Sequence, residues 1–168
     1  MRLLERIFET GIDELLSAPH EVSGNPQFQL SYALRVAVAV VVRDSKVLVV
    51  CRRGDDGNGI SWQFPAGIVK PGMSAETVAI RETLGETGVH CSVARKLGSR
   101  VHPVTNVVCE YILCDYLTGD AQNVDVVENV GVAWIDRDQL GRFIPADQVY
   151  PPVLEALRLT SLLASSAS

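Results

Sequence analysis

Two glutamates four positions apart, Glu82 and Glu86, are the residues whose type and spacing most directly suggest chemistry. In a helix, side chains four residues apart lie on one face about one turn from each other, so the two carboxylates would stand side by side. Like charges at this spacing repel by roughly 0.2 to 0.5 kcal/mol on an exposed helix. A divalent cation between them makes the arrangement favourable, and Mg²⁺ prefers hard oxygen ligands that it shares with substrate phosphates. The pair therefore predicts a Mg²⁺ (or Mn²⁺) site, and the alternative is two solvated helix charges.

The residues around these glutamates have the composition of a helix with defined ends. Ser74 is a preferred N-cap residue, and Gly88 is the glycine that commonly follows a helix end, so a helix is expected from about residue 75 to residue 86. Small residues at i+4 spacing would let the back of this helix lie close to a sheet: Ala75, Ala79 and Thr83. We expect the acidic face of the helix to point away from that sheet.

The segments that would position this helix are mostly strand-like. Two β-branched runs in residues 32 to 53 flank a polar segment at residues 43 to 46, which predicts a β-hairpin. The segment WQFPAG predicts a short strand broken by Pro65 and Gly67. Further strands are expected at residues 92 to 101, 107 to 117 and 130 to 135, with short helices that start at Asp136 or Asp138 and at Pro151, the last running through Leu162. Hairpins mixed with helices predict an α+β fold, in the form of a mixed-sheet α/β/α sandwich.

The chain of 168 residues is long enough for one sizeable core and short for two domains. Apolar residues at spacings of three and four predict an amphipathic helix over residues 2 to 17, and Pro and Gly in residues 18 to 29 predict a linker. We therefore expect an N-terminal helix and linker over residues 1 to 30, one domain over residues 31 to 163, and a frayed Ser/Ala tail over residues 164 to 168. The helix could pack on its own domain or on a second subunit, so a homodimer stays open.

Composition and charge exclude several classes of function. Hydrophobic residues make up 47% of the chain and the net charge is -5, so the sequence is neither disordered nor generally attractive to a nucleic acid polymer. We expect no signal peptide, and no apolar run reaches the roughly 18 residues of a membrane span. The cysteines form no CxxC pair and are expected to be buried free thiols, typical of a reducing cytoplasm: Cys51, Cys91, Cys109 and Cys114.

The run that contains the two glutamates resembles the Nudix box, in which a glycine is followed by a glutamate, an Arg-Glu pair, a Glu-Glu pair and a closing glycine. The residues that match this pattern in register are Gly67, Arg81, Glu82, Glu86, Gly88 and Val89. The hairpin and the segments WQFPAG, SRVHP and VAWID also look like this MutT-like family, so the resemblance covers roughly residues 35 to 140. It implies a Nudix-type α/β/α sandwich, with metal bound by Glu82, Glu86 and the backbone carbonyl of Gly67.

Two positions depart from the family pattern, and both replace an acidic residue. Met73 stands where the family has its first glutamate, which supports the loop. Gly85 replaces the first member of the Glu-Glu pair, which in the family helps to hold a second metal or to orient water. The loss at Gly85 argues against multi-metal catalysis. Glycine at this position also costs roughly 1 kcal/mol in a helix interior relative to alanine.

A third acidic residue is wanted as a general base or a further metal ligand. Glu128 is the best candidate, because it precedes the VAWID strand at the spacing where relatives often carry a glutamate, and Asp125 is the reserve. Either could instead be an exposed loop acid, since such residues are common on surfaces. Arg81 is expected to play a structural role by pairing with loop carboxylates.

Phosphate and base recognition would need cations and an aromatic side chain near the acidic pair. Arginine makes bidentate contacts with phosphate oxygens, so Arg53 and Arg100 are the candidates for substrate binding, among the basic residues at the end of the hairpin and in SRVHP. Each could equally be a solubilising charge at a strand end. Trp62 would stack on a base, or it would pack in the core as large aromatic side chains usually do.

With the acidic pair, the resemblance implies a Mg²⁺- or Mn²⁺-dependent hydrolase of a nucleoside diphosphate-linked substrate, in which the metal neutralises the diphosphate and helps to activate the attacking water. Substrates of the family include (d)NTPs, oxidised nucleotides, nucleotide sugars and ADP-ribose, and the sequence does not choose among them. The alternative is a Nudix-fold binding or regulatory module that lost turnover with the acid at Gly85. The expected partner is a small nucleotide or other diphosphate, with no nucleic acid polymer and no membrane.

Overall fold

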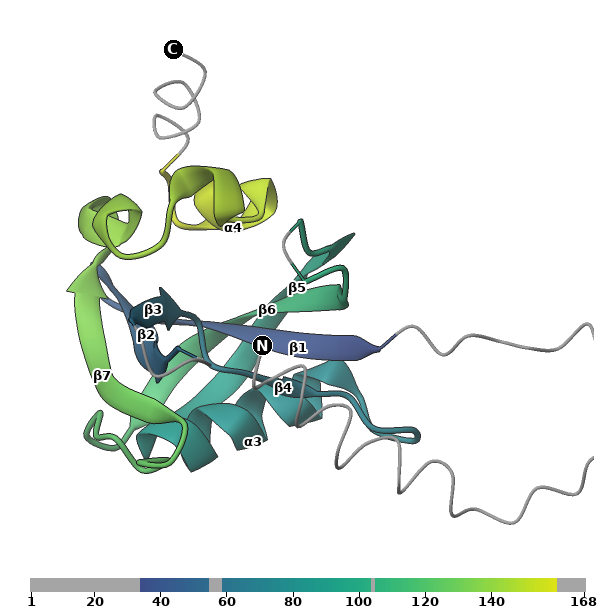
Figure 1. The fold of residues 1–168 in the computed structure, drawn as a ribbon, viewed down its shortest axis with the longest axis horizontal. Helices are drawn as coiled ribbons and strands as arrows, with labels where there is room; N and C mark the ends of the chain where they lie inside the picture. Colours follow the sequence, from purple (N-terminus) through teal and green to yellow (C-terminus); the bar gives the residue numbers. More distant parts are fainter. Residues whose placement is uncertain (1–33, 55–58, 104, 160–168) are drawn as a thin grey trace, which may run out of the picture.

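The computed structural model describes residues 34–54, 59–103 and 105–159. A mixed sheet lies between helix α3 (Ala75–Thr87) on one side and helix α4 (Pro151–Ala156) on the other, as Figure 1 shows. The predicted α+β class and its sandwich form are thus confirmed. The expected N-terminal helix, its linker and the C-terminal tail lie outside the described residues, and the expected division of the chain stays a prediction.

The predicted hairpin is present as strands β1 (Arg35–Arg43) and β2 (Lys46–Arg53). Its tight turn passes through Asp44, whose φ of 51° lies in the left-handed region that Asp tolerates better than most residues. The interiors of both strands are almost fully buried, as expected for β-branched runs covered on both faces. These two strands form the framework on which the remaining strands are placed.

The other strands assemble around β1 and β2 into one seven-stranded sheet. Their bounds are β3 Ile60–Gln63, β4 Ala66–Ile68, β5 His90–Val101, β6 Val108–Thr118 and β7 Asn129–Asp136. β1 runs parallel to β6 and antiparallel to β4, while β2 pairs with β7 and β3, both antiparallel. Pro65 separates β3 from β4 as predicted, but the prediction that Gly67 breaks a strand is wrong, because Gly67 lies inside β4 opposite Ala37.

Helix α3 has the ends that the sequence predicts. The Ser74 hydroxyl accepts a hydrogen bond from the amide of Thr77 at 3.1 Å, and Gly88 closes the helix in a left-handed conformation with φ 71°. The three small residues of the predicted stripe are at most 2% exposed: Ala75, Ala79 and Thr83. Because they add little bulk, the helix axis lies close to the sheet, and this distance sets where its acidic side chains reach.

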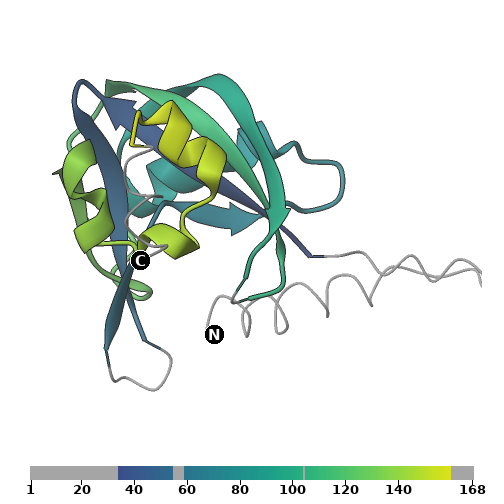
Figure 2. The same cartoon turned by 90° about the horizontal axis from the view of Figure 1, so that it is seen from above.

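The opposite face of the sheet is covered by short helical segments, which Figure 2 shows in front of the strands: η2 (Arg137–Arg142), η3 (Ala146–Gln148) and α4. The start predicted after Asp136 is confirmed, as a 3-10 helix. The prediction that the last helix runs through Leu162 is wrong, since α4 ends at Ala156. Arg158 has a φ of 61°, and the amide of Leu159 bonds back to the carbonyl of Leu154, which closes the helix.

Two apolar cores result, one on each side of the sheet. The larger core lies under the short helical segments, and the smaller core lies under α3. All four cysteines are buried free thiols, as predicted, and burial raises the pKa of Cys109 to about 11. No helix among the described residues is both long enough and apolar enough to cross a membrane.

Glu110 is a buried acid that joins three strands of the sheet. It lies in β6, is 4% exposed, and forms ion pairs with Arg35 of β1 and Lys96 of β5. Burial by itself raises the pKa of the Glu110 carboxyl, but the hydrogen bonds and positive charges of Lys96 and Arg35 outweigh burial and hold the pKa below its usual value of 4.5. Folding therefore stabilises the ionised form of the Glu110 carboxyl group relative to the protonated form.

We predict that Glu110→Gln lowers the free energy of unfolding by on the order of 2 kcal/mol at neutral pH. Because the pKa of Glu110 is lower in the folded protein, its contribution is complete above pH 4.5 and is lost as the pH falls through the folded value. Urea titrations of both proteins at about pH 7, 4 and 3 should show the difference shrinking with acid. Asp136→Asn, which removes the exposed ion pair with Lys46, is the control and should change stability by less than about 0.5 kcal/mol. A constant difference at all three pH values would contradict this account.

Candidate active site

Glu82 lies directly against the glycine that begins the Nudix-like run. A Cβ atom built on Gly67 would lie 2.3 Å from Cγ of Glu82, so only glycine leaves room for this side chain. The Glu82 side chain is 28% exposed, and its Oε1 accepts a hydrogen bond of 3.3 Å from Arg81. Arg81 also lies 3.7 Å from the sulfur of Met73. A thioether carries no charge, so the ionic partner of Arg81 is Glu82 and not residue 73.

Glu86, one turn further along α3, is buried. Its exposed fraction is 5% and it pairs with Arg52 of β2, so the expectation that the acidic face of the helix points away from the sheet is wrong for Glu86. Burial raises the pKa of Glu86 to about 8; Arg52 opposes this shift, and the negative charges of Glu82, Glu128 and Asp125 add to it. The surroundings therefore disfavour an uncompensated negative charge and favour a cation beside this carboxyl group.

Arg52, on β2, connects Glu86 to the third predicted acid. Its Nη2 donates to Oε1 of Glu86 at 2.7 Å, and its Nη1 donates to Oε2 of Glu128 at 2.8 Å. The sequence predicted Glu128 as a partner of the acidic pair, and the structure places it beside Glu86 through this guanidinium. Only 14% of the Glu128 side chain is exposed, so Glu128 is not the solvated loop acid of the alternative interpretation.

The segment between β6 and β7 brings Glu128 to this position by binding the end of α3. The amides of Gln122 and Val124 donate to the carbonyls of Thr87 and Glu86, which a helix end leaves without internal partners. Further along, the Asp125 carboxylate accepts from the amide of Glu128 at 3.2 Å. Asp125 therefore shapes the turn that carries Glu128, and it lies close enough to influence Glu86.

The donor atoms of the predicted metal site are oxygens, the type of ligand that Mg²⁺ prefers. Oε2 of Glu86 is buried and has no hydrogen-bond partner, so one oxygen is available for a cation. Within the described residues, no group of three or more His, Cys, Asp or Glu side chains is placed to hold a metal. Mg²⁺ commonly uses only one or two carboxylates and completes its shell with water and phosphate oxygens. Glu82, Glu86 and the carbonyl of Gly67 offer donors of this kind, and their joint binding of an ion stays a prediction.

The residues predicted to bind substrate lie on the other side of the sheet. Alternate side chains of a strand face opposite sides, so Arg52 faces α3 whereas the exposed Arg53 faces away. Trp62 pairs with Cys51 and packs edge-to-face on Phe143, with ring centroids 5.2 Å apart.

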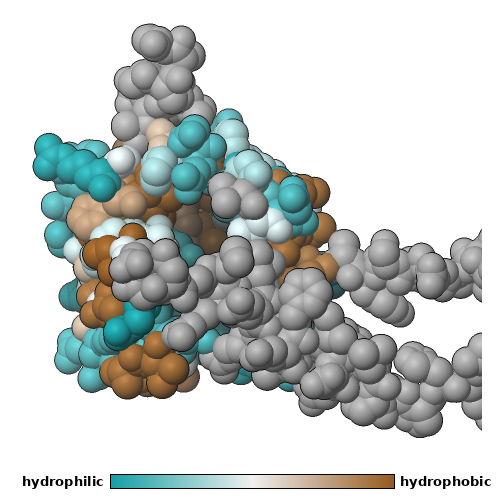
Figure 3. Space-filling view, viewed as in Figure 1, coloured by the Kyte–Doolittle hydropathy of each residue, from teal (hydrophilic) through white to brown (hydrophobic). Residues whose placement is uncertain are grey.

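Arg100 also lies on the side away from α3. Its Nε donates to the Tyr111 hydroxyl at 3.2 Å, and its guanidinium lies over the rings of Tyr111 and Tyr150. The molecule is hollowed on this side, between α4 and the strands, and apolar atoms line the bottom of the hollow (Figure 3). Trp62 and Arg100 are thus near neighbours of the larger core rather than of the acidic pair, and their predicted role in substrate binding is not tested by these contacts.

Sequence reasoning gave less weight to Arg52 than to Arg53, and it missed Asn129. Asn129, the first residue of β7, pairs with Arg52 across the strands and is 1% exposed, yet neither atom of its amide group has a partner. Strand alternation was the available signal for Arg52, because its side chain lies on the same face as Leu48. For Asn129 the sequence carries no comparable signal.

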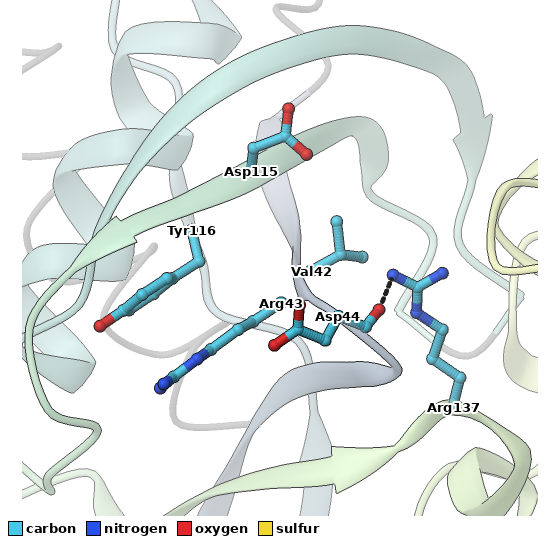
Figure 4. Close-up of a pocket in the computed structure, with 6 residues that line it drawn as sticks. All are labelled: Val42, Arg43, Asp44, Asp115, Tyr116 and Arg137. Carbon is cyan, nitrogen blue, oxygen red and sulfur yellow. Dashed lines mark hydrogen bonds between the residues drawn. The ribbon is translucent and has the colours of Figure 1, made fainter.

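A pocket at the far end of the β1–β2 hairpin is separate from this acidic site. Figure 4 shows its six lining residues: Val42, Arg43, Asp44, Asp115, Tyr116 and Arg137. The Arg43 guanidinium lies 4.5 Å from the centre of the Tyr116 ring, and Arg137 donates to the carbonyl of Asp44. Its two arginines and two aspartates balance in charge, so nothing in the pocket selects an anion.

Comparison with known proteins agrees with the geometry. The chain resembles a solved structure of a NUDIX hydrolase from Nitrosomonas europaea with a TM-score of 0.58 and 18% identity, over 81% of this chain and 73% of the other, which shows the fold. A Bacillus subtilis (strain 168) protein named "Putative 8-oxo-dGTP diphosphatase" is 30% identical over 108 residues, 64% of this chain and 70% of that protein. A "MutT-like protein" of Streptomyces ambofaciens is 27% identical over 125 residues, 74% of this chain and 75% of that protein.

The family model for the NUDIX domain matches residues 33–157, which is most of the chain and all of the acidic site. The protein belongs to the Nudix hydrolase family, whose members act on nucleoside diphosphate-linked compounds. The matched segment begins just before β1 and ends just after α4.

We predict that Gly67→Ala weakens metal binding by about tenfold or more, because the new methyl group must push Glu82 out of its position. Isothermal titration calorimetry with Mn²⁺ on the purified protein measures the change in affinity. Gly131→Ala is the matched control, since a Cβ there meets Cys51 at an ordinary 3.9 Å in β7, and its Mn²⁺ affinity should equal that of the wild type. Equal affinity in the Gly67 variant would remove Glu82 from the proposed ligand set.

Proposed function

We propose that the protein is a Mg²⁺- or Mn²⁺-dependent hydrolase that cleaves the diphosphate bond of a nucleotide. The observation that carries this proposal is the buried carboxyl group of Glu86, of which one oxygen has no hydrogen-bond partner, one helical turn from the Glu82 side chain that lies against Gly67. A buried acidic oxygen without a partner is unfavourable unless a cation or a water occupies the space next to it. The family relationship makes a metal-bridged diphosphate the natural occupant.

A divalent ion at this position would neutralise phosphate charge and lower the pKa of a water molecule. Glu82 and Glu86 would hold that ion from one helix, and Arg81 would keep Glu82 turned toward Gly67. Glu128 is the proposed proton acceptor for the attacking water. Its carboxylate is held by Arg52 at the edge of the buried group and is partly open to solvent, so a proton can leave.

The rest of the substrate would extend around the end of β2 into the hollow on the other side of the sheet. Arg53 is the exposed last residue of β2, so its guanidinium can reach and bind a phosphate group of the substrate. Trp62 and Arg100 border the larger core beside the hollow, where a planar base would find aromatic surface. The name of the Bacillus subtilis relative makes an oxidised purine nucleotide the first candidate substrate.

We predict that the purified protein releases phosphate or pyrophosphate only with Mg²⁺ or Mn²⁺ from at least one compound of a panel with dNTPs, 8-oxo-dGTP, nucleotide sugars and ADP-ribose. Glu86→Gln should reduce kcat by more than about 100-fold, because the amide cannot replace the carboxylate as a ligand of the ion. Circular dichroism spectra of both proteins check that the fold is unchanged. Equal turnover by the variant would exclude Glu86 and the proposed centre with it.

The second candidate is a nucleotide-binding or regulatory module of the same fold, and the residue at Gly85 favours it. A Cβ at Gly85 meets no atom within 4 Å, so the position is open and an acid there would be tolerated. Such a module would be stabilised thermally by a nucleotide without cleaving it, since a ligand that binds only the folded state raises its stability.

Gly85→Glu separates the two functions, with Gly85→Ala as its matched control. Both variants remove a glycine from the helix and should gain about 1 kcal/mol of stability, but only the first adds a carboxylate. If the natural protein is a hydrolase with a complete site, we expect turnover by Gly85→Glu within about threefold of Gly85→Ala, far less than the hundredfold or larger effects of essential groups. A rise of about 100-fold in Gly85→Glu alone would mark the natural protein as a binding module.

A further inference from the structure

Arg52 lies between two acidic side chains, where the proposed function calls for positive charge. Its two terminal nitrogens lie 2.7 Å from Oε1 of Glu86 and 2.8 Å from Oε2 of Glu128. The exposed fractions of the Arg52, Glu86 and Glu128 side chains are 11%, 6% and 14%. A guanidinium stays protonated in proteins, and its planar fork holds both carboxyl groups in one orientation. It is therefore a fixed positive charge inside the acidic group.

We propose that the Arg52 guanidinium fills one of two cation positions among these acidic side chains, so that the centre accepts a single divalent ion. The proposal rests on the function proposed above, because it concerns the same centre. Arg52 is then a positioning residue: it takes Oε1 of Glu86 and leaves Oε2 buried and without a hydrogen-bond partner. That remaining oxygen, with Glu82 and the carbonyl of Gly67, supplies the ligands of the one ion.

The balance of charge favours one ion over two. Glu86 and Glu128 share the Arg52 guanidinium, Glu82 lies one turn before Glu86 and is paired with Arg81, and Asp125 bonds to the amide of Glu128, so four carboxyl groups belong to this part of the molecule. Arg52 and Arg81 offset two of these negative charges and one divalent ion offsets the other two, so a single ion balances the centre. A second divalent ion would have to displace Arg52, and a buried guanidinium that loses both of its partners is strongly unfavourable.

The helix offers no ligand that would hold a second ion elsewhere. Gly85, one residue before Glu86, has no side chain, and the space beside it is open. The absence of an acid at Gly85 and the presence of Arg52 at the centre are thus two independent features that both point to one ion.

The test counts Mn²⁺ ions bound to the full chain in the absence of nucleotide, by isothermal calorimetry and by the Mn²⁺ signal in electron paramagnetic resonance. We expect one ion per chain for the wild type. Arg52→Met removes the charge and keeps the bulk, so the space between Glu86 and Glu128 should take up a second ion. Arg52→Lys keeps one positive charge and should still bind one ion. Arg53→Met is the matched control, because its side chain is exposed on the other face of β2, and it should also bind one ion.

Two ions on the wild-type protein would overturn the proposal, and so would one ion on a folded Arg52→Met variant or two ions on Arg52→Lys. If Arg52→Met does not fold by circular dichroism, the wild-type and Arg52→Lys counts decide the question. A wild-type protein that binds no Mn²⁺ would overturn the proposed function as well. That result differs from a count of two, which refutes the role of Arg52 alone.

Discussion

The burial of the Glu86 carboxyl group is the constraint on which the rest of the site depends. A carboxyl group that is 5% exposed must be hydrogen-bonded, paired or neutralised, because an isolated buried charge is strongly unfavourable. In this protein Arg52 satisfies one oxygen and the other has no partner. The site is thus prepared for a cation on one side and closed by the protein's own cation on the other.

Several features of the fold serve to bring Glu86 to that place. Small residues on the back of α3 let the helix approach the sheet, and a longer side chain at Ala79 or Thr83 would lift both glutamates away from it. Gly67 leaves room for Glu82 in the same way. On the far side, the segment after β6 binds the last carbonyls of α3 and carries Glu128 to Arg52. Sheet, helix and loop meet at one group of four charged side chains.

The departures from the family pattern form a consistent set. Met73 offers Arg81 only a thioether sulfur as a weak acceptor, and the ionic partner of Arg81 is Glu82. Gly85 removes a carboxylate from a centre in which Arg52 already occupies a position between two others. Fewer acids and one built-in guanidinium change the number of cations that the proposed centre needs, so the substitutions alter how the charge is balanced and leave the proposed ligands Glu82 and Glu86 in place.

The sequence by itself determined the hairpin, helix α3 and the spacing of the acidic pair. Local signals fixed α3, since Ser74 and Gly88 act within a few residues of the helix ends, and the β-branched runs fixed the hairpin in the same way. Spacing along one helix also fixed that Glu82 and Glu86 lie together. Such features depend on neighbours in the chain, which a sequence displays directly.

Only the tertiary structure decided which distant residues meet them. That Glu86 is buried, that Arg52 rather than Arg53 reaches it, and that Glu128 joins from the loop before β7 all depend on strand register and on contacts across 34 to 76 positions. The same holds for Trp62 and Arg100, which lie across the sheet from the glutamates. Burial and long-range pairing arise from packing of the whole chain, and no local pattern records them.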